Sequence, residues 1–260
     1  MKMVKSFKKK YNNIEETFRI VIKHFDAGNI HKFRLEVKKL NSLLRLAGIV
    51  HKHSRLLALH KFYKAVGIIR SPQLQQQRIV LLKRERYKIL SKSYLKYLKQ
   101  AIADEKVKAV NLIKRKKPFG KEVKKIVDRL PERLKRTSIQ TFIDQKMGIH
   151  TRLLKLNSIS DESLHVARKS LKDMVYISSE VKESSLIPSS SSVSKKTIHA
   201  TTKLLGEFHD KCVSLDLLQA HVKLQPINTE ERKIWHDLEN EWWEEKERDR
   251  VKIHAIFKRS

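Results

Sequence analysis

Four basic side chains stand at helical spacing in residues 29–48. They are His31, Arg34, Lys38 and Arg45, separated by three, four and seven residues. At about 100° per residue they fall within an arc of roughly 60°, and apolar residues occupy the neighbouring sector. At about 1.5 Å per residue this stripe is about 21 Å long, so it suits several phosphates of a polymer better than one small metabolite. Arginine and lysine are strong donors to phosphate oxygens.

A second stretch in the middle of the chain repeats the spacing of the first. His165, Arg168 and Lys172 keep the offsets of three and seven residues that separate His31 from Arg34 and Lys38. Apolar residues again accompany them at helical spacing. We interpret the two stripes as an internal duplication, which predicts two similar helical bundles.

A glycine follows each stripe, and an ionisable residue stands three positions after it. The first pair is Gly67 and Arg70, and the second pair is Gly206 and His209. The interval between the two glycines is slightly longer than the interval between His31 and His165. The serine-rich segment 184–194 lies where the additional residues are needed, and its composition predicts a flexible loop.

The composition predicts a helical protein with a polyanionic partner. The 260 residues include 58 Lys and Arg against 28 Asp and Glu, for a formal net charge of +30. Such self-repulsion indicates that a polyanion neutralises part of the charge, and the candidates are DNA, RNA, inorganic polyphosphate and an anionic membrane surface. The chain has only 6 Gly and 5 Pro, and its long runs rich in Leu, Lys, Glu, Ile and Arg favour helix. We therefore predict an all-α fold.

The cellular location follows from cysteine usage and from the hydropathy pattern. The chain has one cysteine, Cys212, so an internal disulfide cannot form, which fits a reducing compartment. The basic start lacks the apolar run of an export signal, and no stretch approaches 18 uninterrupted apolar residues. We expect a cytoplasmic protein without a membrane span.

Two helix breaks are predicted in the first half of the chain. Proline disfavours helical geometry in the residue before it, so Ser71 and Pro72 are expected to end a helix that begins near residue 53. The helical pattern from residue 73 to about residue 113 is long for a globular protein, and we expect a break near Asp104.

The boundary between the two repeats is placed at the run 114–121, which combines charge, proline and glycine. The first repeat is then 1–116 and the second is 117–260, within a single domain of residues 1–260. Both repeats are expected to be helical.

At these residues the sequence resembles the CHAD family, the conserved histidine α-helical domain. The signature of that family is a helix reading approximately H-x-x-R-x-x-x-[RK]-[RK]-x-R in each of two repeats, followed by L-G-x-x-R-D. The resemblance covers nearly the whole chain, and the matching residues are His31, Arg34, Lys38, Lys39, Gly67 and Arg70, then His165, Arg168, Lys172, Gly206 and Asp210. The departures, which predict a thinner cationic lining, are Asn41, Ser71, Asp173, Val175 and His209.

The resemblance implies two pseudo-symmetric four-helix bundles around a basic central channel that binds inorganic polyphosphate. It also implies a binding module rather than an enzyme, often located at polyphosphate granules, with an enzyme of polyphosphate metabolism as a candidate partner. No catalytic residue, metal ligand or cofactor is predicted.

Further lining residues are predicted where the fourth and the last helical segments are most basic. The complete predicted polyphosphate-binding set is His31, Arg34, Lys38, Lys39, Arg45, Arg70, Lys83, Arg84, Arg86, His165, Arg168, Lys172, His209 and Arg248. A histidine close to a polyanion should have a raised pKa, so binding is expected to tighten below neutral pH.

Three other interpretations fit parts of the sequence. A helical nucleic-acid-binding protein explains the net charge equally well, but it does not explain the duplicated His-Arg-Lys spacing. A metal-dependent phosphohydrolase could use His209 and Asp210, yet no further His and Asp set stands at a suitable spacing. A basic stripe beside an apolar face can also be a solvated surface whose long side chains cover the core.

Overall fold

The computed structural model describes residues 1–49, 57–82, 85–115, 119, 122–154, 159–181, 195–224 and 229–258. Within these ranges the protein is all-α, as predicted, with nine helices and no strand beyond an isolated bridge between Lys2 and Arg133. The helices are α1 (Met3–His24), α2 (Ala27–Leu46), α3 (Leu57–Val80), α4 (Glu85–Arg115), α5 (Glu122–Val127), α6 (Arg136–Leu154), α7 (Asp161–Val181), α8 (Lys195–Leu224) and α9 (Thr229–Lys258). None of the described helices combines the length and the apolar character needed to cross a membrane.

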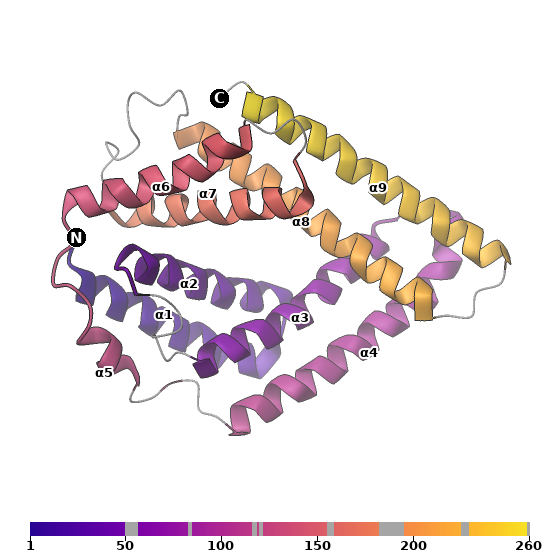
Figure 1. Ribbon diagram of the computed structural model, residues 1–260. Helices are drawn as coiled ribbons and strands as arrows, with labels where there is room; N and C mark the ends of the chain where they lie inside the picture. The colour runs from indigo at the N-terminus through magenta and orange to yellow at the C-terminus, as the bar shows by residue number, and fades with distance from the viewer. Residues whose placement is uncertain are drawn as a thin grey trace.

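The long helices form two sets of four, and the short α5 lies between them in the chain (Figure 1). In the first set, consecutive helices from α1 to α4 pack against each other, and α6 to α9 do the same in the second set. The sets meet through α2 with α7, α3 with α8 and α4 with α9. Each of these pairs joins helices that hold the same position in the order of their set, which is consistent with the predicted internal repeat. The predicted boundary at 116 and 117 lies outside the described residues and stays a prediction.

Each set has an apolar core, and a third core joins the two sets. In the first set, Phe62 meets Phe18 and Phe33 edge-on, with ring centroids 4.8 and 5.3 Å apart. The second core gathers the apolar faces of α6, α7 and α8. The third joins the ends of α3 and α4 to α8 and α9, where Tyr94 lies edge-on to Trp235 at 5.5 Å. Burial of this apolar surface fixes the helices and with them the polar faces that they carry.

Helix α3 continues through Pro72, so the break predicted there is wrong. A proline in a helix interior removes one backbone donor and costs about 3 kcal/mol. Tertiary contacts on both sides offset this cost, because Ile69 and Ile79 are buried and the buried Gln75 donates hydrogen bonds to groups on α4 and α8. Helix α3 therefore presents one continuous face across the proline.

The break predicted near Asp104 is also wrong. Helix α4 runs on to Arg115, and on its exposed surface Gln100 Nε2 donates to Asp104 Oδ1 at 2.8 Å, one turn away. The chain turns at Leu81 and Leu82 instead, where the backbone bonds to α3 shorten to the i to i+3 pattern. The helical pattern was predicted correctly, but its interruption lies about twenty residues earlier.

Candidate functional site

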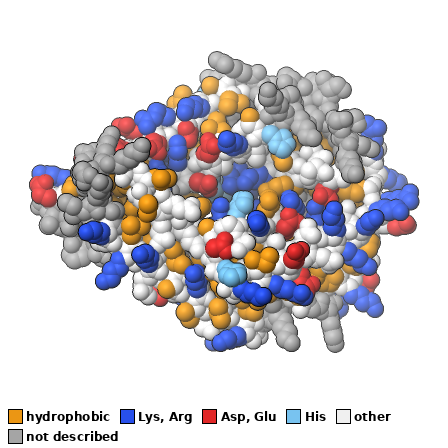
Figure 2. All heavy atoms as spheres, turned by 180° about the vertical axis from the view of Figure 1, so that it is seen from behind, with side chains coloured by type: hydrophobic (Ala, Val, Ile, Leu, Met, Phe, Trp, Pro, Cys, Tyr) orange, Lys and Arg blue, Asp and Glu red, His pale blue; other side chains and the backbone are white. Residues whose placement is uncertain are grey.

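A cavity of about 1370 Å³ lies between the two sets of helices. Its walls come from α2 and α3 of the first set and from α7 and α8 of the second, with one residue each from α6 and α9. Figure 2 shows Lys and Arg side chains gathered at the bottom of a hollow in one face of the molecule. The cationic lining residues are Arg34, Lys38, Arg45, Arg70, Arg78, Lys146, Arg168, Lys169, Lys172, Lys203 and Lys211.

The α2 wall follows the stripe identified in the sequence. Asp26 begins the helix, because its Oδ1 accepts a hydrogen bond from the backbone N–H of Asn29 at 2.9 Å. The apolar face of α2 is buried in the first core, so the basic face is turned the other way. All four stripe residues consequently line the cavity: His31, Arg34, Lys38 and Arg45.

Gly67 leaves the space that the Arg34 guanidinium occupies. Arg34 Nη1 donates to the backbone oxygen of Tyr63 at 2.5 Å, and the guanidinium carbon lies 4.1 Å from the Tyr63 ring centroid. A Cβ atom at position 67 would lie 2.1 Å from Nη1, so a side chain there would displace the guanidinium. Burial lowers the pKa of Arg34, and the nearby charges of Arg70 and Arg168 lower it further. The guanidinium is therefore held in place before any anion arrives.

The α7 wall repeats this arrangement with a looser fit. His165, Arg168 and Lys172 line the cavity, and the rings of His165 and His209 lie 4.8 Å apart. A Cβ atom at Gly206 would lie 4.0 Å from Arg168 Nε, which is an ordinary van der Waals contact. The glycine of the second set therefore does not decide where its arginine lies.

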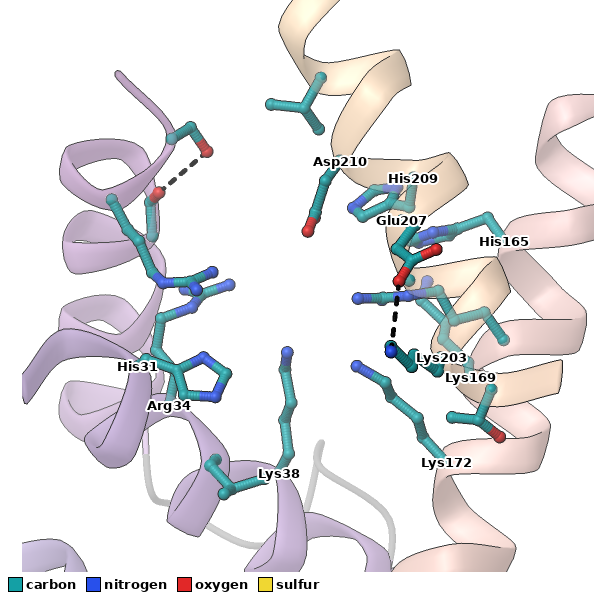
Figure 3. A pocket seen from close by; sticks show the side chains of 18 of the residues that line it. His31, Arg34, Lys38, His165, Lys169, Lys172, Lys203, Glu207, His209 and Asp210 are labelled. Carbon is teal, nitrogen blue, oxygen red and sulfur yellow. Dashed lines mark hydrogen bonds and ion pairs between the residues drawn. The ribbon is translucent and has the colours of Figure 1, made fainter. Parts of the chain in front are cut away.

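Lys38 of α2 and Lys172 of α7 extend into the same space from opposite walls (Figure 3). In the described part of the chain, neither ammonium group has an ion pair with a carboxylate. Burial lowers the pKa of Lys38 to about 7, and the nearby Lys172 is the next cause. Burial also lowers the pKa of Lys172 to about 8, with the charge of Arg168 as the second cause. The two walls thus bring unneutralised cations close together.

The surroundings of three cavity histidines, His31, His165 and His209, disfavour their charged form. Burial lowers the pKa of His31 and of His165, and the neighbouring Arg and Lys charges add to the effect. The same causes lower the pKa of His209 to about 4. A neutral imidazole still offers one N–H donor. The rise in pKa expected beside a polyanion concerns the complex and stays a prediction.

Arg45 lines the cavity but is already paired with a carboxylate. Asp173 of α7 accepts hydrogen bonds from Arg45 and from Ser42 Oγ, the latter at 2.6 Å, and Lys146 Nζ lies 2.9 Å from its Oδ2. Burial alone would raise the pKa of Asp173, but the hydrogen bonds from Arg45 and Ser42 outweigh it and lower the pKa. This network joins α2, α6 and α7, and it leaves Arg45 with less charge to offer a ligand.

Two predicted residues lie outside the cavity. Lys39 is turned about 100° away from the stripe, and its Nζ pairs with Glu36 Oε1 at 2.6 Å. Arg248 of α9 has a 61% exposed side chain, 3.5 Å from Glu244. Three further predicted positions cannot be placed, because the described residues exclude Lys83, Arg84 and the side chain of Arg86.

Five cationic lining residues were not predicted from the sequence: Arg78, Lys146, Lys169, Lys203 and Lys211. Arg78 follows Gly67 by eleven residues on the same face of α3, a relation that the expected helix break concealed. Lys203 precedes Gly206 by three residues and could have been found by extending the glycine motif backwards. Lys146 reaches the cavity only because α6 packs beside α7, and no local pattern indicates this.

The acidic lining residues all belong to the second set of helices. They are Asp173, Glu207, Asp210 and Glu245. Among the described residues, no group of three or more His, Cys, Asp and Glu side chains is arranged to hold a metal ion. The lining is therefore cationic overall, with its few carboxylates on one side.

These observations define the class of protein: it is all-helical, with a basic cavity between two similar sets of helices. Residues 5–219 match the family profile of the CHAD domain, so the chain belongs to the CHAD domain family. This confirms the family resemblance seen in the sequence.

Solved structures share this fold. PptA from Streptomyces chartreusis is similar with a TM-score of 0.75 at 10% identity, over 98% of each chain. The CHAD domain from the plant Ricinus communis is similar with a TM-score of 0.71 at 15% identity, over 96% of this chain and 88% of that one. At such identities the likeness shows the fold alone. No curated protein sequence matches the chain.

Proposed function

We propose that the protein binds inorganic polyphosphate in this cavity and does not react with it. The observation that carries the proposal is the convergence of two basic helix faces, one on α2 and one on α7, on a single cavity. Membership of the CHAD family supports the proposal, because the resemblance implies this ligand. Association with polyphosphate granules and with an enzyme of polyphosphate metabolism is part of the same proposal.

The electrostatics of the cavity favour a polyanion. Burial lowers the pKa of Lys38 to about 7 and that of Lys172 to about 8, and mutual repulsion of the cations contributes to both. A phosphate chain brings a negative charge with each unit and oxygens that accept charge-assisted hydrogen bonds. Binding would relieve the repulsion and raise the pKa of both lysines.

The shape of the site favours a thin chain. The basic stripe of α2 is about 21 Å long and faces inward, between two sets of helices, rather than outward on a convex surface. A linear phosphate polymer can follow such a stripe and contact both walls. Among the described residues, six of the eleven lining cations have no ion pair with a carboxylate, and one small phosphate compound would leave most of these six without a partner: Arg34, Lys38, Arg70, Arg168, Lys169 and Lys172.

Nonspecific nucleic-acid binding is the second candidate, and one observation favours it. The formal net charge of the chain is +30, whereas the cavity lining has only eleven Lys and Arg against four Asp and Glu. Most of the excess charge therefore lies elsewhere and is available to any polyanion.

Competition binding separates the two candidates. Labelled duplex DNA or RNA is bound first, and long-chain sodium polyphosphate is added at matched phosphate and salt concentrations. We expect polyphosphate to displace the nucleic acid, whereas the reverse exchange should fail. The proposal would be overturned if the nucleic acid displaced polyphosphate while polyphosphate failed to displace the nucleic acid.

A second assay tests whether the protein leaves the ligand intact. Polyphosphate is incubated with the protein and a divalent ion, and orthophosphate is measured. We expect no release above the protein-free control. Divalent-dependent release would show an enzyme instead of a binding module.

A further inference from the structure

One carboxylate stands in the basic cavity without a cation in contact with it. Asp210 of α8 lines the cavity, and its carboxylate points into the space between the two walls (Figure 3). Burial lowers the pKa of three cations near it, and the negative charge of Asp210 offsets part of this effect in Arg70, Arg168 and Lys172. Nevertheless, within the described residues Asp210 has no ion pair.

The other acidic residues of the lining differ from Asp210 in this respect. Asp173 is buried in its network with Arg45, and Glu245 Oε2 lies 2.7 Å from Arg78 Nη2. Glu207, one turn before Asp210 on α8, has Lys203 Nζ 3.9 Å from its Oε1, and both side chains belong to the cavity lining. Asp210 is itself exposed to solvent, so a hydrated ion can reach it.

A lone carboxylate in this position repels an uncoordinated phosphate chain. A divalent cation such as Mg²⁺ reverses the sign of that interaction, because carboxylate and phosphate oxygens can bind the same ion. Mg²⁺ is usually held by one or two carboxylates together with substrate phosphates, and it keeps several of its waters. One protein carboxylate is therefore enough when the phosphate chain supplies other oxygens.

We infer that Asp210 makes the cavity prefer a phosphate chain that carries a hydrated divalent cation, which the Asp210 carboxylate and the phosphate oxygens share. The inference rests on the proposed function, since the chain brings the ion with it. The lack of any group of three or more metal-binding side chains among the described residues agrees with an ion that arrives on its ligand. Asp210 is then a residue that determines specificity, while the surrounding cations provide the affinity.

The test compares the Kd for long-chain sodium polyphosphate in EDTA and in Mg²⁺, at one ionic strength. The variants are Asp210→Asn and Asp210→Ser, the latter copying Ser71, which stands at the matching position of the first half. Asp216→Asn is the matched control, because it removes the same charge from an exposed position on the same helix that lies outside the cavity lining. Thermal melting of each variant verifies that it is folded.

Mg²⁺ neutralises part of the charge on polyphosphate, so by itself it weakens binding to every variant. In the wild-type protein and in Asp216→Asn, the bridge through Asp210 should offset this weakening. The ratio of the Kd in Mg²⁺ to the Kd in EDTA should consequently be at least about fivefold higher in both Asp210 variants than in the wild-type protein. In EDTA the Asp210 variants should bind more tightly than wild type, because the repulsion is gone.

Two outcomes would overturn the inference. Equal ratios for wild type and for the Asp210 variants would show that no cation is shared there. A change in Asp216→Asn equal to that in the Asp210 variants would show a response to overall charge only. Absence of binding by the wild-type protein in both media is a separate result. It would contradict the proposed function itself, and the inference with it.

Discussion

The two walls of the cavity come from similar stretches of sequence but carry different charges. Among the described residues, the first set contributes five lining cations and no acid: Arg34, Lys38, Arg45, Arg70 and Arg78. The second set contributes six lining cations together with all four acids. The positive charge of the cavity is therefore concentrated on the α2 and α3 wall, where we expect a phosphate chain to make its strongest contacts.

The difference arises at positions that match between the two copies. Counted from the histidine of each stripe, Asp173 matches Lys39, and counted from the glycine of each motif, Asp210 matches Ser71. Asp173 bonds to groups of α2 and α6, so it joins the two sets, whereas Asp210 remains without an ion pair in the described structure. The first set thus presents a wall of cations without acids, whereas the second set also links the two sets through Asp173 and carries the carboxylate of Asp210.

The largest effect is expected from removing the arginine of each wall. Arg34→Ala should weaken polyphosphate binding by about 10- to 100-fold, because a charge-assisted donor held in place is lost. Arg168→Ala should have a smaller effect, since Arg168 lies on the wall that also carries acids. Titration of labelled polyphosphate measures both, and thermal melting should change little.

The control for this pair is Lys9→Ala, which removes an exposed charge on α1 outside the cavity lining. It should change the Kd by less than about twofold, as expected for a screened surface charge. Equal losses for Lys9→Ala and Arg34→Ala would mean that binding depends on diffuse charge and needs no cavity.

The two glycines provide a matched test of how each wall is built. Gly67→Ala should weaken binding by about tenfold, because the new Cβ would displace the Arg34 guanidinium, and misplacing a pre-ordered donor costs affinity. Gly206→Ala should leave the Kd nearly unchanged, since its Cβ has room beside Arg168. Alanine favours a helix interior over glycine by about 1 kcal/mol, and thermal melting of both variants verifies that each is folded.

A double-variant cycle sharpens this prediction. If Gly67 acts through Arg34, combining Gly67→Ala with Arg34→Ala should weaken binding no further than Arg34→Ala does alone. Additive losses would show that the glycine matters for another reason, such as direct approach of the ligand to the backbone.

Affinity should fall as the pH rises above 7. The pKa values of about 7 for Lys38 and about 8 for Lys172 mean that these groups lose protons in the free protein, while a bound polyanion keeps them protonated. Binding then takes up protons, and the Kd should rise between pH 7 and 9 by at most about tenfold per pH unit for each group. Lys38→Arg should flatten the curve, because arginine stays charged.

Stability of the free protein should change in the opposite direction over the same range. The unfolded chain keeps protons on these lysines up to the ordinary pKa of 10.5, so it binds more protons than the folded state above pH 7. These groups therefore increase the free energy of unfolding as the pH rises through 7 and 8, so the folded state becomes more stable. A Kd that does not depend on pH at constant ionic strength would contradict the placement of the two ammonium groups.

The smallest effect on binding is expected at Asp173. Asp173→Asn should lower the free energy of unfolding by about 1–3 kcal/mol, because a buried carboxylate with three donors is lost. Affinity should rise only slightly, as Arg45 gains freedom to contact the ligand. Urea unfolding and the Kd measure the two changes, with Glu15→Gln in the exposed pair with Arg19 as a control that should alter neither.

The sequence predicted the helical class and the stripe residues that line the cavity on α2 and α7, although it also included Lys39 and missed Lys169. Both depend on local periodicity, which places His31, Arg34 and Lys38 on one side of a helix and apolar side chains on the next. Gly67 was identified by its place in a repeated motif, but its contact with Arg34 belongs to the packing of α3 on α2.

The features that the sequence did not predict depend on contacts between distant segments. Pro72 stays inside α3 because α4 and α8 bind the residues that follow it. The pairing of Arg45 with Asp173 requires α2 and α7 to lie side by side, and a stripe on one helix contains no information about a carboxylate on another. Lys146 lines the cavity for the same reason, because α6 packs beside α7.

The most direct test of the central claim is the position of a bound anion. A crystal of the protein soaked with a short polyphosphate should show electron density between Lys38 and Lys172, within hydrogen-bond distance of Arg34 and Arg168. Density for the phosphate chain only on the outer surfaces, with water alone in the cavity, would contradict the account.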